Sequence, residues 1–114
     1  MITRLFFISI ILLNSTLSYA ESNWSYSILG NKNSKCISAL KEEKYKEAIA
    51  PCTSDAVKGD AQIQYNLGIL HFKGLGTDKN YKLSFPLFLK SAKQNYESSL
   101  NFVGISYEKG YGTE

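Results

Sequence analysis

The sequence predicts an all-α protein, a solenoid of antiparallel helix hairpins with about two and a half repeats. Within each repeat, apolar residues recur at helical spacing. A fixed period between repeats is typical of a solenoid, in which each helix pair buries its apolar face only by stacking on its neighbours. The period here is 36 residues, since Leu67, Gly68, Gly74 and Gly76 recur as Val103, Gly104, Gly110 and Gly112.

Residues 1–20 have the pattern of a cleaved signal peptide. Arg4 supplies a positive charge, an apolar run extends from Leu5 to Leu13, and small residues precede the expected cleavage site. A membrane anchor is the alternative, but it needs about 20 apolar residues, and Asn14 ends this run much sooner. We therefore expect a mature chain that begins at Glu21, is secreted or periplasmic, and has no stable membrane insertion.

The charge balance disfavours nucleic-acid binding. The chain has 13 basic and 10 acidic residues, a net charge of +3, and loss of Arg4 with the signal peptide lowers the 13 to 12. Lysines alternate with acids, for instance over residues 41–47, as on the solvated face of a helix. We expect a protein or peptide partner and no nucleic acid.

The mature chain begins with a leader segment, residues 21–32, which has neither helical nor strand periodicity. An N-terminal helix hairpin follows over residues 33–59. Its first helix runs from about 33 to 43, and its second runs from Tyr45 to Lys58. Gly59 is expected to end the second helix in the left-handed conformation.

A complete repeat occupies residues 60–95. Asp60 and Asn80 are the predicted N-caps of helices 61–73 and 81–94. The glycines of the loop between these helices permit positive φ, and Asn95 is expected to do so at the end of the repeat. Pro51 and Pro86 are predicted to bend the two second helices.

Gly68 lies in the middle of helix 61–73, where glycine costs about 1 kcal/mol relative to alanine. Its recurrence as Gly104 predicts that a partner helix crosses both positions so closely that a side chain would not fit.

Residues 96–114 form a partial repeat, with one helix predicted over 97–109. The second helix of this unit is missing, so we expect part of an apolar stripe to stay exposed and to favour self-association or a partner. The two explanations are a truncated sequence and a partner that takes the place of the missing helix. The stripe consists of Leu100, Val103, Ile105 and Tyr107.

The two cysteines, Cys36 and Cys52, are predicted to form a disulfide. The signal peptide places the chain in an oxidising compartment, where two cysteines indicate one bridge. If the turn centres between Glu43 and Lys44, the cysteines lie at nearly the same level of two antiparallel helices. A functional thiol pair is the alternative, but exchange sites favour Cys-x-x-Cys spacing.

Three segments, Ala61–Gly68, Lys73–Gly76 and Lys90–Asn95, resemble the Sel-1-like repeat, a relative of the tetratricopeptide repeat. The resemblance extends over about residues 35–114. It implies a right-handed α-solenoid whose first helices line a concave groove, and a role in binding proteins or peptides. The sequence departs from the family in three ways: the first unit lacks the glycine loop, the last unit is cut off, and serines replace the usual alanines at Ser84 and Ser91.

The resemblance also implies which residues face the groove, although packing within the solenoid is the competing role for the aromatic ones. His71 corresponds to Tyr107 in the next repeat, so a packing role is favoured over metal binding or catalysis. We expect no metal and no cofactor. The groove positions are Gln62, Tyr65, Ile69, Phe72 and Lys73 in one unit, and Ser98, Asn101, Ile105, Glu108 and Lys109 in the next.

An enzyme is the rival class. Two segments, Ser38–Lys41 and Ser106–Lys109, match the Ser-x-x-Lys form of serine acylating enzymes, but their companion motifs are absent. We therefore expect no enzyme activity. A small hydrolase or penicillin-binding activity, as associated with some cysteine-rich Sel-1-like proteins, and an inhibitor or toxin module remain the alternatives.

Overall fold

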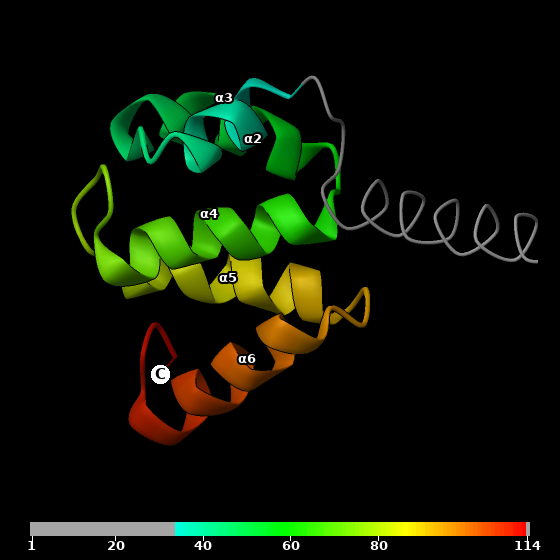
Figure 1. Cartoon of the computed structure of the whole chain (residues 1–114). Helices are drawn as coiled ribbons and strands as arrows, with labels where there is room; N and C mark the ends of the chain where they lie inside the picture. Colours follow the sequence, from blue (N-terminus) through cyan, green and yellow to red (C-terminus); the bar gives the residue numbers. More distant parts are fainter. Residues whose placement is uncertain (1–33, 114) are drawn as a thin grey trace, which may run out of the picture.

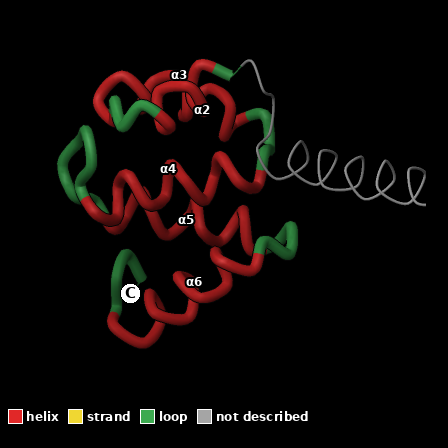
Figure 2. Tube along the Cα trace, viewed as in Figure 1, coloured by secondary structure: helices red, strands yellow, loops and turns green. Residues whose placement is uncertain are grey.

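The computed structural model describes residues 34–113, and in that range every regular element is an α-helix. Figure 1 shows the helices in successive layers, with α2 and α3 in the first, α4 and α5 in the second, and α6 at the far end, and short loops connect them (Figure 2). The predicted all-α class is confirmed for this part of the chain, whereas the predicted signal peptide and leader segment lie outside it. The helices are α2 (Lys35–Lys41), α3 (Tyr45–Val57), α4 (Ala61–Lys73), α5 (Tyr81–Ala92) and α6 (Glu97–Lys109).

Side-chain caps mark the first residues of α4 and α5. The Asp60 side chain accepts a hydrogen bond from the backbone N–H of Ile63 at 3.0 Å. Asn80 accepts one from the N–H of Leu83 at 3.1 Å. These are the predicted N-caps, and each satisfies an N–H group that has no partner within the helix. Helix α5 ends at Ala92, two residues earlier than predicted.

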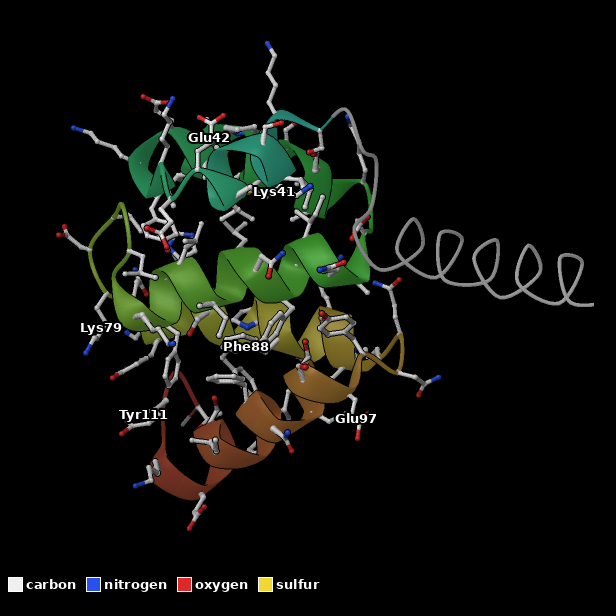
Figure 3. All side chains as sticks on the ribbon, in the orientation of Figure 1. Lys41, Glu42, Lys79, Phe88, Glu97 and Tyr111 are labelled. Atoms are coloured by element: carbon white, nitrogen blue, oxygen red, sulfur yellow. A yellow bond between two sulfur atoms is a disulfide. The ribbon has the colours of Figure 1, made fainter. Side chains whose placement is uncertain are left out.

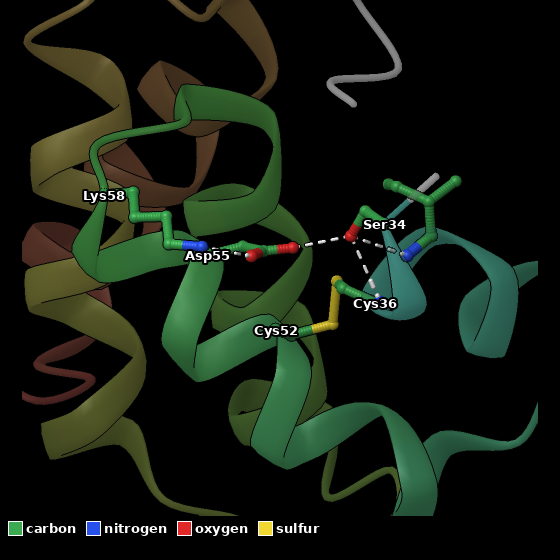
Figure 4. Close-up of polar contacts among 6 residues, drawn as sticks. Ser34, Cys36, Cys52, Asp55 and Lys58 are labelled. Carbon is green, nitrogen blue, oxygen red and sulfur yellow. Dashed lines mark hydrogen bonds and ion pairs between the residues drawn. A yellow bond between two sulfur atoms is a disulfide. The ribbon is translucent and has the colours of Figure 1, made fainter. Parts of the chain in front are cut away.

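The first helix pair is held by a disulfide and by a polar cluster beside it (Figure 4). The predicted bond between Cys36 and Cys52 is present, and both residues are fully buried. Next to it, the Ser34 hydroxyl caps α2 and donates a hydrogen bond to Asp55 of α3 at 2.5 Å. The same carboxylate lies 3.6 Å from the ammonium group of Lys58. The start of α2 is thus attached to α3 by one covalent bond and one hydrogen bond.

Replacing both Cys36 and Cys52 with alanine is expected to lower the free energy of unfolding by about 3 kcal/mol, because the bond closes a loop of about 15 residues in the unfolded chain. Urea denaturation of the double variant measures this loss. As a control, dithiothreitol should destabilise the parent chain by a similar amount and leave the double variant unchanged. Equal stability of the parent chain with and without reductant would contradict the prediction.

A hydrophobic core joins the first helix pair to α4. Apolar residues at helical spacing on α4 are buried in it, with Ile63, Leu67 and Leu70 each at most 3% exposed. Gln64 is buried too, and its side-chain amide donates a hydrogen bond to the Ala56 carbonyl at 3.1 Å. The buried apolar residues of this core are Cys36, Ile37, Ala48, Cys52, Ala56, Ile63, Leu67 and Leu70.

Helix α5 crosses α4 at Gly68. A Cβ atom at that position would lie 2.7 Å from Cε1 of Phe88, so the predicted close approach is confirmed there. The same explanation is wrong for Gly104, because a Cβ atom there would have nothing within 4 Å. The physical reason is that the described residues place no second helix over α6. Gly104 occupies the same position in its repeat as Gly68, but no side chain like Phe88 packs against it.

A second glycine contact recurs at the spacing of the sequence repeat. A side chain on Gly76 would overlap the backbone of Tyr45, at the start of α3. A side chain on Gly112 would overlap the backbone of Tyr81, at the start of α5. Both glycines have positive φ, 73° and 74°. The glycine loop after one helix therefore packs on the start of an earlier helix in the same way twice.

Candidate binding surface

The predicted groove residues lie on one face of α4 and on one face of α6. On α4, Lys73 is exposed and the other four residues are half-buried. On α6, Ser98, Asn101 and Ile105 are all exposed. The four half-buried residues of α4 are Gln62, Tyr65, Ile69 and Phe72.

Aromatic side chains bring the two helices together at this face. The Phe102 ring of α6 lies 5.9 Å from the Tyr65 ring and 5.2 Å from the Phe72 ring of α4. It also stacks on Phe88 of α5, with 4.7 Å between ring centroids, and Figure 3 places Phe88 between α4 and α6. Offset and edge-on ring pairs of this kind are each worth about 0.5–1.5 kcal/mol beyond their buried area. We call the set Tyr65, Phe72, Phe88, Tyr96, Phe102 and Tyr111 the aromatic cluster.

The other members of the cluster come from the loops on either side of α6. Tyr96 lies 5.2 Å from the Tyr65 ring. Tyr111, which is labelled in Figure 3, lies 5.6 Å from the Phe72 ring. Only Phe88 is fully buried, and the rest of the cluster is half-buried. Tyr65 and Phe72 therefore pack within the fold and also present part of their rings to solvent.

The predicted groove residues do not include four members of the aromatic cluster: Phe88, Tyr96, Phe102 and Tyr111. Comparison of the repeats could not have found Phe102, because its counterpart 36 residues earlier is Asn66. The available signal was the aromatic content, which is 13% of the chain.

Two tyrosines of the aromatic cluster, Tyr65 and Tyr96, have hydroxyl groups with raised pKa values. Burial raises the pKa of the Tyr65 hydroxyl. Burial also raises the pKa of Tyr96, and the neighbouring Tyr65 and Asp60 add to the shift. Both phenols therefore stay protonated near neutral pH, and the charged residue among the predicted groove positions of α4 is the exposed Lys73.

His71 lies on the opposite side of α4, where only 9% of it is exposed and its Nδ1 atom has no hydrogen-bond partner. Burial lowers the pKa of its imidazole. This position fits the predicted packing role. Residues 34–113 contain no group of three His, Cys, Asp or Glu side chains that could hold a metal ion.

Acid should destabilise the protein through His71. Because burial lowers the folded-state pKa, the unfolded chain takes up the proton first, at its ordinary pKa of about 6.5. The contribution of His71 to stability is therefore complete above that pH and declines as the pH falls below it. In His71→Gln, the free energy of unfolding, measured by urea denaturation between pH 7.5 and about 5, should decline less than in the parent chain. Identical pH profiles would contradict this.

The two Ser-x-x-Lys segments differ in the exposure of their serines. Ser38 is exposed on α2. Ser106 is fully buried in α6, and its hydroxyl has no hydrogen-bond partner. A buried hydroxyl cannot meet a substrate without local opening of the helix packing.

Comparison with protein-family models finds no match for this chain, and no curated protein sequence matches it. No helix among residues 34–113 combines the length and the apolar character that a membrane crossing requires.

Proposed function

We propose that this chain is a protein- or peptide-binding scaffold of the Sel-1-like type, a right-handed α-solenoid that binds its partner along the exposed faces of α4 and α6. The observation that carries the proposal is the half-buried aromatic cluster. Protein-binding surfaces are enriched in aromatic side chains that are held rigidly and surrounded by polar residues. Here the partly exposed rings of Tyr65 and Phe72 are held by packing, and Lys73, Ser98 and Asn101 are exposed on the same two helix faces.

Two recurring features support the solenoid part of this proposal. The contacts Gly76–Tyr45 and Gly112–Tyr81 repeat at the spacing of 36 residues found in the sequence. Helix packing also proceeds in chain order, since α3, α4 and α5 each contact the helices before and after them. Units that stack on their chain neighbours are the defining property of solenoids.

We also propose that the protein is secreted or periplasmic. The Cys36–Cys52 disulfide supports this, because such bonds persist in oxidising compartments. N-terminal sequencing of the exported protein is the test, and the expected first residue is Glu21.

The binding proposal can be tested with random linear peptides displayed on phage and selected on the immobilised protein. Binding of the selected peptides should weaken by about tenfold in Ile105→Ala, which removes an exposed apolar side chain from the predicted surface. The matched control is Leu83→Ala, which removes an exposed apolar side chain from α5. Equal binding to both variants, or a selection that yields no peptide, would reject the proposed surface.

A further inference from the structure

Helix α6 exposes a face that is buried on α4, its counterpart in the preceding repeat. On α6, Leu100 is 51% exposed, Tyr107 is 63% exposed and Gly104 is exposed. Val103, between them, is half-buried. We call these four residues, Leu100, Val103, Gly104 and Tyr107, the terminal face; their spacing of i, i+3, i+4 and i+7 puts them on one side of the helix.

The corresponding residues of α4, 36 positions earlier, are buried. Gln64 is 4% exposed, Leu67 is 3% and His71 is 9%, and Gly68 between them is also buried. The same stripe is therefore covered in one repeat and open in the other.

Two neighbours cover this stripe on α4. Leu67 packs in the core with the first helix pair, and Gln64 bonds to Ala56 of α3, whereas the part around Gly68 is covered by α5.

Helix α5 places the fully buried Phe88 against Gly68, at a distance that leaves no room for a Cβ atom. Two small residues on the same side of α5, Ser84 and Ser91, are fully buried as well. The Ser91 hydroxyl donates a hydrogen bond to the Ala61 carbonyl, at the start of α4, over 2.6 Å. Around Gly68 the stripe thus accepts a helix with one aromatic side chain, a small residue four positions before it and another three positions after it.

At Gly104 the space for such an aromatic side chain is open, since nothing lies within 4 Å of a Cβ atom built there. From these observations, we propose that the terminal face binds an amphipathic helix of a partner protein whose chemistry resembles that of α5. The aromatic side chain of this helix packs on Gly104, and its flanking small residues allow it to approach Leu100 and Tyr107. A second copy of this chain does not supply such a helix, because its own Phe88 is fully buried.

A labelled peptide with the sequence of residues 79–95 serves as the probe, because it contains α5. We expect it to bind the purified chain in a saturable, one-to-one manner by fluorescence anisotropy. Replacing the residue of the peptide that corresponds to Phe88 with alanine should weaken binding by about tenfold or more. Failure of the parent peptide to bind, or equal binding of the two peptides, would overturn the proposal.

Two protein variants identify where the peptide binds. Gly104→Leu fills the open space with a side chain that has no neighbours to clash with, so the variant should fold and lose peptide binding. Asn101→Leu, a change at another exposed position of α6 that lies on the predicted groove face, should retain it. If Asn101→Leu lost peptide binding while Gly104→Leu retained it, the peptide would bind in the groove and the inference would be overturned. The result of this test does not depend on whether the groove proposal is correct.

A fusion protein tests the same contact without depending on the affinity of a free peptide. A second copy of residues 79–95 joined directly after Glu114 places its phenylalanine 20 residues beyond Gly104, as Phe88 lies 20 residues beyond Gly68. This fusion should raise the melting temperature by about 4 °C or more, and an alanine in place of the added phenylalanine should remove the gain.

Light scattering of the parent chain tests whether a second copy occupies the terminal face instead. A stable dimer that excludes the peptide would assign the face to a second copy and reject the partner helix.

Discussion

Phe88→Ala is expected to lower the free energy of unfolding by about 3–5 kcal/mol, the range for removing a large buried aromatic side chain. Phe88 is fully buried and contacts Gly68, Tyr65, Phe72 and Phe102, so its removal leaves a cavity bordered by three helices. Rigid packing on several sides limits how far the neighbours can relax into that cavity. Urea denaturation followed by far-ultraviolet circular dichroism measures the loss.

The control for this prediction is Leu83→Ala on the same helix. Leu83 is 51% exposed, so its truncation should change the free energy of unfolding by no more than about 0.5 kcal/mol. If the two variants lost the same stability, Phe88 would not be the residue that joins α4, α5 and α6.

The starts of α4 and α5 could be predicted from the sequence because they depend on local chemistry, whereas α2 and α5 are shorter than predicted. Asp60 and Asn80 cap the N-termini of α4 and α5 as predicted, since each side chain reaches an N–H three residues ahead. Asn95 has the predicted positive φ, 63°. The cysteine pair was also predictable, because the two cysteines lie at similar distances from the turn that joins two antiparallel helices, which brings them to the same level.

The aromatic cluster was not predictable in the same way. Tyr65 and Phe72 could be selected from the resemblance to the Sel-1-like repeat, but their contacts with Tyr96, Phe102 and Tyr111 depend on how α6 and its loops pack against α4. None of these three residues has an aromatic counterpart 36 positions earlier. The repeat therefore preserves the backbone arrangement while the side chains between units differ.

Gly104 shows where the argument from the period fails. The sequence predicted the same close crossing at Gly68 and Gly104, but a crossing also requires the second helix, and only α4 has one among the described residues.

Gly76 shows a different limit of prediction from the sequence. Its positive φ was predictable from the glycine loop, whereas its contact with Tyr45 joins residues from different repeats and leaves no local signal in the sequence.

Gly76→Ala is accordingly expected to cost about 2–5 kcal/mol, as the sum of two effects. The left-handed conformation at φ 73° costs a residue with a Cβ atom about 1–2 kcal/mol. The overlap with the backbone of Tyr45 and Lys46 adds about 1–3 kcal/mol, because a backbone cannot move aside as a flexible side chain can.

Gly110→Ala separates the two effects. Gly110 has the same φ of 73°, but a Cβ atom there has nothing within 4 Å. This variant should lose only the conformational term, about 1–2 kcal/mol. Urea denaturation of both variants measures the difference, and a larger loss in Gly76→Ala is the contribution of the contact between the glycine loop and the start of α3. Equal losses would mean that the loop moves away from Tyr45 at little cost, and the repeated glycine contact would then not be what joins one unit to the next.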